Sequence, residues 1–261
     1  MERGNFDGRD QLREQEHARE NLDAARRRME QLSVERKEAT VEAREQPSVA
    51  QSDQRALAAA QEGIDEHRDH YIKAQGRAVE RVAMYKLRDD GAITDLNKQV
   101  GENFPIYDVA SDKHIASVKC KGLDDGAVLS DATKNAYIRD FEEAVGQGTN
   151  PEKFANAAKY LNQAAQKSGV ELSPEIATSE DSAKAYLREN ATLMMPDDHA
   201  IAVKNELRGR LFSNDPIERQ VAAERMGLDV NARDYDAQAL NMLNRIQGAG
   251  VYSFEIKQMM D

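Results

Sequence analysis

NFPIYDVASDKHIASVKCKG, residues 103–122, is the one stretch of the chain in which apolar residues change from helical spacing to strict alternation. Alternation of apolar and polar residues is typical of a β-strand with one buried face. We expect strands over residues 106–110 and 115–121, joined by a polar turn at residues 111–114. A hairpin within residues 104–121 is therefore the predicted centre of the fold.

The predicted hairpin has one polar face and one apolar face. If residues 110 and 115 pair across the turn, Asp108 lies opposite Ser117, two residues from Lys119. Because side chains alternate along a strand, these three polar residues share a face. The other face predicts packing on a core and carries Tyr107, Val109, Ala116, Val118 and Cys120. An acid and a lysine that converge on one polar face indicate a functional site.

A strand that bears an aspartate, followed by a turn and a strand that bears a lysine, resembles the core of the PD-(D/E)XK nuclease fold. The version FP-x-x-D followed by A-S-V-K is similar to that of C-terminal toxin domains in bacterial contact-dependent inhibition systems, which cleave RNA. The resemblance spans residues 103–137. By position, it implies that Asp108 is the first motif acid, that Ser117 replaces the second acid, and that Lys119 is the motif lysine.

The resemblance implies a bacterial toxin or effector that cleaves the phosphodiesters of RNA or DNA, RNA being favoured, and that has an immunity protein as partner. Lys119 would stabilise charge on the phosphate, Asp108 would orient a water or hold one Mg²⁺ ion, and Ser117 would hydrogen-bond a phosphate oxygen. Nucleases of this fold often carry an acid on the preceding helix, which makes Glu80 a fourth candidate. A hydroxyl is a poor Mg²⁺ ligand, so the sequence leaves the cofactor open.

The composition predicts a predominantly helical α+β protein. Hydrophobic residues make up 40% of the 261 residues, which permits a core, and strong helix formers dominate. The formal net charge of −11 argues against a general nucleic-acid coat, which needs a basic surface. A nuclease would need a local basic strip, for which the nearby candidates are Lys113, Lys119, Lys121 and Lys134.

Other features of the sequence indicate the cellular compartment of the protein. The single cysteine, Cys120, excludes an internal disulfide and fits a reducing environment. No apolar run approaches the ~20 residues that span a bilayer, and the charged N-terminal residues differ from a signal peptide. We therefore expect a cytoplasmic protein, or one delivered to a target cell by a secretion machine, without a membrane partner.

Two long helices are expected before the hairpin. Apolar residues at spacings of three and four predict helices over residues 9–45 and 53–87, separated by Pro47. The short link predicts that they form an antiparallel pair of coiled-coil type. We assign residues 1–90 to this docking or delivery module, which would bind a protein partner or a second copy, and residues 91–261 to an α+β domain.

The C-terminal half is expected to supply helices that pack on the hairpin. Residues 170–176 are predicted to form an edge strand interrupted by Pro174. Asp198 and His199 suggest acid–base chemistry, but neighbours on a helix point in different directions, which favours a capping role. Four residues are predicted to cap helices: Ser130, Asn150, Asp197 and Asp215.

Two functions stay open at this point. In the first, the hairpin is the site of a nuclease toxin. In the second, the chain is a helical interaction or structural protein, and Asp108 and Lys119 form a cross-strand ion pair worth ~0.2–1 kcal/mol. A cleft between the hairpin and the C-terminal helices would favour the enzyme, whereas burial against the N-terminal helices would favour the structural role.

Overall fold

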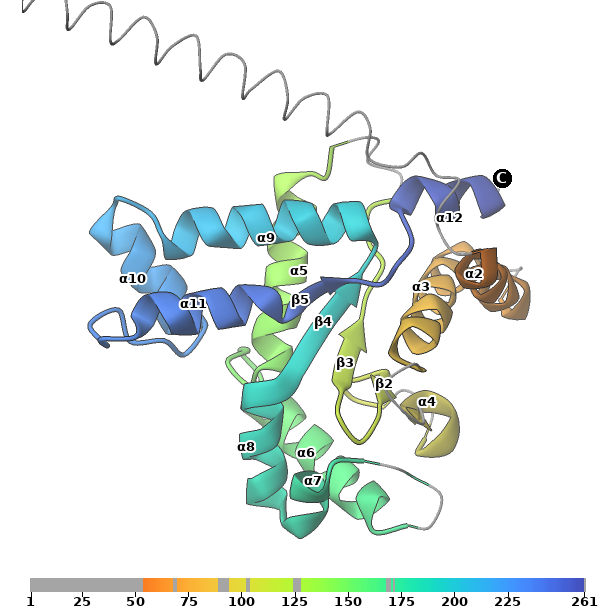
Figure 1. The fold of residues 1–261 in the computed structure, drawn as a ribbon, viewed down its shortest axis with the longest axis horizontal. Coiled ribbons are helices and arrows are strands. Elements are labelled where there is room, and N and C mark those ends of the chain that lie inside the picture. The colour runs from red at the N-terminus through yellow and green to blue at the C-terminus, as the bar shows by residue number, and fades with distance from the viewer. Residues whose placement is uncertain are drawn as a thin grey trace, which may run out of the picture. The chain divides into compact units, whose positions relative to one another are not determined.

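The computed structural model describes residues 54–67, 70–88, 94–101, 104–123, 128–167, 170 and 172–260. The helix predicted over residues 9–45 and the link at Pro47 lie outside these residues. The described part of the chain has a predominantly helical α+β fold built on one five-stranded mixed sheet (Figure 1).

The sheet consists of β1 Thr94–Asp95, β2 Val109–Ala110, β3 Ile115–Val118, β4 Ala191–Met195 and β5 Ile246–Gly248. The strands lie side by side in the same order as along the chain. β1–β2 and β2–β3 pair antiparallel, whereas β3–β4 and β4–β5 pair parallel. The start of β2 and the ends of β3, β4 and β5 therefore lie together, at what we call the C-terminal end of the sheet.

The predicted hairpin is present, with shorter strands than expected. Ala110 pairs with Ile115, as predicted. The backbone N–H of Ser111 donates to the carbonyl of His114 at 2.7 Å and closes the turn. The register that places the polar residues of the two strands together is therefore the one expected from the alternation.

Four of the five residues predicted for the apolar face of the hairpin do pack in one core cluster: Val109, Ala116, Val118 and Cys120. Tyr107 is the exception. It lies in a different cluster, and its hydroxyl donates to the carbonyl of Ala144 at 2.7 Å. The alternation does not extend to Tyr107 because the chain turns sharply at Ile106, before β2 begins.

The helix predicted over residues 53–87 is in fact two helices, α2 Gln54–Glu66 and α3 Tyr71–Leu87. They pack closely at Gly63, where an added Cβ would come within 2.6 Å of the Arg77 carbonyl oxygen. The prediction of one helix is wrong because the apolar stripe continues in register through both helices. Its two halves cover each other, and periodicity gives no sign of the break.

One face of the sheet is covered by α3, and α2 and α12 Ser253–Met260 pack against α3 (Figure 1). Val79 and Val82 of α3 share a core cluster with Val118 of β3 and Met194 of β4. The residues that the structure describes all belong to one compact unit. α3 belongs with the sheet because β3 and β4 cover its apolar side.

The opposite face is covered by α5 Asp131–Ala144, α9 Asp197–Leu211 and α11 Tyr235–Asn244. Phe141 of α5, Val203 of α9 and Leu243 of α11 share a core cluster with Leu193 and Met195 of β4. α10 Pro216–Arg225 packs against α9 and contributes small residues to the same cluster.

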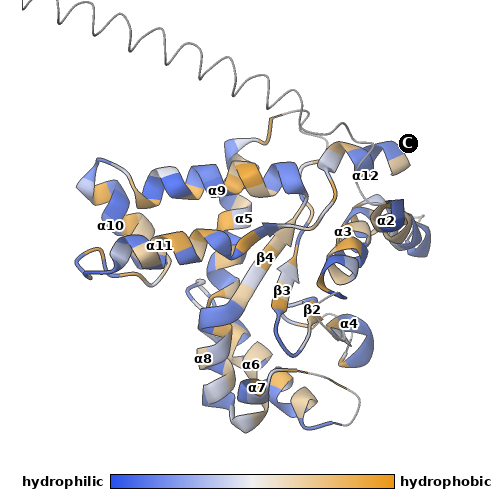
Figure 2. Cartoon of the chain, in the orientation of Figure 1, coloured by the Kyte–Doolittle hydropathy of each residue, from blue (hydrophilic) through white to orange (hydrophobic). Residues whose placement is uncertain are grey.

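A third cluster joins α4 Leu96–Gln99, α6 Pro151–Ala165 and α8 Glu180–Asn190 to the hairpin, with α7 Pro174–Thr178 packed beside them. Most helices carry both hydrophobic and hydrophilic residues in Figure 2, as expected where one side faces a core. Among the residues that the structure describes, no helix is long and apolar enough to cross a membrane.

Three of the predicted helix caps are confirmed: Ser130, Asn150 and Asp215. The prediction for Asp197 is wrong, because Pro196 is the N-cap of α9 and the Asp197 carboxylate accepts the backbone N–H of Gly250 at 2.9 Å. The predicted edge strand at residues 170–176 is also wrong. Pro174 instead opens α7, where a missing backbone N–H costs nothing.

Candidate functional site

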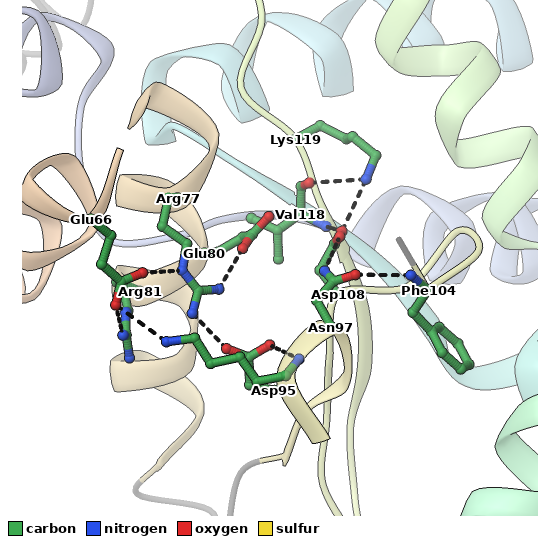
Figure 3. Close-up of polar contacts among 11 residues, drawn as sticks. Glu66, Arg77, Glu80, Arg81, Asp95, Asn97, Phe104, Asp108, Val118 and Lys119 are labelled. Carbon is green, nitrogen blue, oxygen red and sulfur yellow. Dashed lines mark hydrogen bonds and ion pairs between the residues drawn. The ribbon is translucent and has the colours of Figure 1, made fainter. Parts of the chain in front are cut away.

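Asp108 and Lys119 meet at the C-terminal end of the sheet, as the hairpin predicts. Oδ2 of Asp108 accepts from Nζ of Lys119 at 2.9 Å and from the backbone N–H of Val118 at 2.7 Å (Figure 3). Oδ1 accepts a longer bond of 3.4 Å from the amide of Asn97. The side chains of Asp108 and Lys119 are 12% and 30% exposed, so the pair is held firmly yet remains open to solvent.

A strained turn directs Asp108 into this position. The N–H of Tyr107 donates to the carbonyl of Pro105 at 2.9 Å, and Ile106 between them has φ of 71°. A three-residue turn with positive φ is the rare form, and it is unfavourable for a β-branched residue. Such strain is concentrated at functional sites. Because of this turn, β2 begins only at Val109. The Asp108 carboxylate therefore accepts the backbone N–H of Val118, which a longer β2 would have bound.

Glu80 of α3 lies at the same site. Its carboxylate is 18% exposed, and Oε2 accepts from Nη1 of Arg77 at 2.7 Å. Burial raises the pKa of Glu80 above its ordinary value, and the negative charge of Asp108 raises it further, against the opposing effects of Arg77 and Lys119. The structure therefore brings together three of the four predicted site residues: Glu80, Asp108 and Lys119.

Ser117 is the fourth predicted residue, and it is only 1% exposed. It lies within β3, paired in register with Leu193 of β4. A substrate phosphate does not reach its hydroxyl in this conformation. The candidate chemistry of the site therefore rests on Glu80, Asp108 and Lys119.

Arg77 is the residue that the sequence analysis misses. Its side chain is 7% exposed and binds three carboxylates, those of Glu66, Glu80 and Asp95 (Figure 3). The only sequence signal is the spacing of three residues between Arg77 and Glu80, which is typical of ordinary helix surface pairs. The partners on α2 and β1 are brought in by tertiary folding and leave no local pattern.

Asn97 of α4 is a second residue that sequence reasoning does not single out. Its amide donates to Asp108, and its carbonyl oxygen accepts the backbone N–H of Phe104 at 2.9 Å. Asp95 caps α4 by accepting the N–H of Lys98 at 3.2 Å. α4 thus connects the Arg77 network to Asp108.

The basic strip expected near the hairpin is largely engaged in ion pairs. Lys121 pairs with Asp140 at 2.7 Å. Lys134 pairs with Asp131 at 2.6 Å and with Glu206 at 3.2 Å. With Lys119 bound to Asp108, three of the four lysines already have acidic partners.

Asp198 and His199 border a separate pocket of about 430 Å³, which is lined by residues of α5 and α9 and by Val128 and Leu129. The Asp198 carboxylate accepts the backbone N–H of Ser253 at 2.9 Å, and Nδ1 of His199 lies 3.0 Å from the hydroxyl of Tyr137. Oδ2 of Asp198 and Nε2 of His199 are 3.9 Å apart, which is longer than a hydrogen bond. The two residues therefore do not form an acid–base dyad here.

The chain was compared with protein-family models, with curated proteins and with solved structures, and none of them matches it significantly.

Proposed function

We propose that this protein is a nuclease that cleaves phosphodiesters, RNA in preference to DNA, and acts as a bacterial toxin or effector. Glu80, Asp108 and Lys119 form its site. The observation that carries the proposal is the convergence of these three side chains, from α3, from the residue before β2 and from the residue after β3, at one end of the sheet (Figure 3).

The order of the elements adds support. An acid on a helix, an aspartate just before a strand, a lysine just after the next strand and a following helix occur in the order that the sequence resemblance implies. The site also lies at the C-terminal end of parallel strands, where α/β proteins commonly bind ligands. The strained turn at Ile106 aims Asp108 at the same place.

Each residue has a chemical role. The Lys119 ammonium group would move from Asp108 to a substrate phosphate and stabilise the charge that develops there. Asp108, once released, would accept a hydrogen bond from the attacking water and orient it. Glu80 supplies a second carboxylate in a partly dry environment, where electrostatic interactions are stronger than in water.

The residues fit a Mg²⁺ ion. Mg²⁺ is commonly bound by one or two carboxylates, with water and substrate phosphate completing its shell. Glu80 and Asp108 supply two such carboxylates, each of which is paired with a cation, Arg77 and Lys119 respectively. Glu80 and Asp108 would hold the ion, which would supply charge stabilisation to the phosphate. Groups of three potential ligands are absent from the residues that the structure describes.

Induction in bacteria tests this function. The wild-type chain should reduce survival and produce discrete RNA fragments, whereas D108A and K119A should be harmless at equal levels of folded protein. K153A is the control, because Lys153 forms a more exposed lysine–carboxylate ion pair with Glu143 at 2.6 Å, away from the site. Harmless expression of folded wild-type protein would overturn the proposal.

The alternative is a helical protein that binds a partner without catalysis. Ile217 and Val221 favour it, because they lie one turn apart on α10 and are 75% and 49% exposed. The position of Asp108 beside α3 and α4, rather than in a cleft with the C-terminal helices, also fits this role. In that case Asp108 and Lys119 stabilise the hairpin, and both variants would be as harmless as the wild type.

A further inference from the structure

The pocket of about 430 Å³ beside α5 and α9 has no part in the proposed chemistry. These two helices cover the face of the sheet opposite α3 (Figure 1). Pockets that bind small ligands commonly measure about 300–1,000 Å³. Apolar side chains line part of the pocket, and polar side chains of α5 and α9 line the rest. Its size and mixed lining suit a single nucleoside.

The pocket and the proposed site border the same segment of the chain, from Lys119 to Lys121. The hydroxyl of Tyr137 accepts the backbone N–H of Lys121 at 2.7 Å. The same hydroxyl lies 3.0 Å from Nδ1 of His199, which lines the pocket. Two residues of chain span at most about 7 Å, so Lys119 lies close to these groups. One strand of RNA that has a phosphate at Lys119 can therefore place a neighbouring nucleotide at the pocket.

The charges that line the pocket favour an uncharged group over a phosphate. Asp198 and Glu206 are acidic. Lys134 is basic, but it already pairs with Glu206 at 3.2 Å and with Asp131 at 2.6 Å. A phosphate would meet more negative than positive charge here, whereas a base and its ribose would carry no charge into the pocket.

Two side chains of α9 can bind such a group by hydrogen bonds. Asn205 is exposed, and its amide has no hydrogen bond to any residue that the structure describes. The Asp198 carboxylate accepts the N–H of Ser253 at 2.9 Å and the Ser253 hydroxyl, which leaves about two of its four acceptor positions. Seven residues separate Asp198 from Asn205, about 10 Å along the helix axis. A nucleoside can contact both, with its ribose at one end and its base at the other.

We infer that this pocket binds one unpaired nucleotide of the RNA substrate, with Asn205 bound to an adenine or cytosine base and Asp198 bound to the ribose 2′-hydroxyl. Both bases carry an amino group beside an unprotonated ring nitrogen, which matches the oxygen and the NH₂ of an asparagine amide. Uracil has no amino group, and DNA has no 2′-hydroxyl. The inference rests on the proposed cleavage of RNA and adds a selectivity for base and sugar.

Titration of the full chain with free nucleosides tests the pocket without cleavage. In ¹⁵N NMR spectra, the side-chain NH₂ signals of Asn205 should shift with cytidine and with adenosine. Uridine and 2′-deoxycytidine should each bind about fivefold more weakly or worse, because each lacks one of the two hydrogen bonds. N205A should bind cytidine no better than uridine. Equal affinity for cytidine, uridine and 2′-deoxycytidine, or no shift at Asn205, would overturn the inference.

Sequencing of fragment ends tests the same selectivity during cleavage. One position near the cut should contain adenine or cytosine about fivefold more often than uracil, and N205A should lose this preference. N205Q should retain part of it. N156A is the matched control, because Asn156 is also an exposed asparagine within a helix, α6, and does not line the pocket.

The outcomes separate the inference from the proposed function. In a chain that cleaves RNA, a base preference that is unchanged in N205A would overturn the role of the pocket alone. A folded wild type that cleaves no RNA would overturn the proposed nuclease. The nucleoside titration would then still decide whether the pocket binds a nucleoside.

Discussion

Glu66 and Glu80 bind the same arginine, yet their pKa values move in opposite directions. Burial would raise the pKa of Glu66, but hydrogen bonds from Arg77, Arg81 and Lys98 lower it to about 2. Glu80 is more deeply buried, has a single cation in hydrogen-bond contact, and lies near Asp108, so its pKa is raised. The charge of Glu66 therefore stabilises the folded state, whereas the charge of Glu80 destabilises it.

Glu66 should make the fold sensitive to acid. Because its pKa is lowered to about 2 in the folded state, its contribution is complete above its unfolded value near 4.5. That contribution should be lost as pH falls from about 4.5 towards 2. We expect E66Q to have a lower free energy of unfolding at pH 7, and a smaller further loss across this range. Urea unfolding at several pH values checks this, and equal acid sensitivity of both proteins would contradict it.

The contribution of Glu80 to stability should depend on pH with the opposite sign to that of Glu66. Its raised pKa means that the folded state disfavours the carboxylate, so its contribution to stability falls as pH rises above the unfolded value. In E80Q, the amide oxygen can still accept from Arg77. We expect E80Q to be as stable as the wild type or more stable at pH 7, and inactive as a nuclease. A clearly destabilised E80Q would show that this carboxylate serves the fold.

Among the elements, the pair α2 and α3 contains two glycines with contrasting surroundings. A Cβ at Gly63 would lie 2.6 Å from the backbone of α3, whereas a Cβ at Gly76 would meet nothing within 4 Å. G63A should therefore destabilise the fold by about 1–3 kcal/mol through overpacking. G76A should stabilise it by about 0.5–1 kcal/mol, because alanine loses less backbone entropy in a helix. Chemical denaturation of both variants checks the pair, and similar effects would contradict the described packing.

Some elements could be predicted from sequence and others could not, for physical reasons. Ser130, Asn150 and Asp215 mark helix starts because a cap needs a particular side chain beside the first turn. The hairpin is visible because polar and apolar residues alternate in its sequence, although β3 is buried at every residue. β4 has apolar residues at four of its five positions, so it lacks the alternation that identifies a strand. β5 has only three residues, too few to show a pattern.

The candidate site, like the fold, could be predicted only in part from the sequence. Asp108 and Lys119 follow from the alternation of the hairpin, and Glu80 follows only from a family resemblance. Arg77 and Asn97 act through partners distant in sequence, so their surroundings give no signal. The turn at Ile106 was also hidden, because nothing in an isoleucine indicates a positive φ.

For the whole molecule, the charge limits how nucleic acid can bind. The net charge is −11, and three of the four lysines near the site are paired with acids. A bound RNA should therefore neutralise few of its phosphates. The logarithm of the binding constant falls with the logarithm of salt concentration by about 0.7 for each phosphate neutralised in a single strand.

We expect the D108N variant to bind single-stranded RNA with a salt slope no steeper than about −1.5, which corresponds to two phosphates. K113A should reduce the slope further, because Lys113 forms no ion pair with any residue that the structure describes. Fluorescence anisotropy at several salt concentrations measures both values. A slope of about −4 or steeper would show that a basic surface outside the hairpin holds the RNA.

Cleavage of labelled RNA and DNA by the purified chain, with and without Mg²⁺, is the decisive test of the proposed nuclease function. We expect RNA cleavage by the wild type and by K153M, and a loss of about 100-fold or more in D108N and in K119M. Urea unfolding of the same samples should show that both variants are folded. A folded wild type that cleaves neither nucleic acid, or D108N and K119M variants that cleave as well as the wild type, would rule out this function.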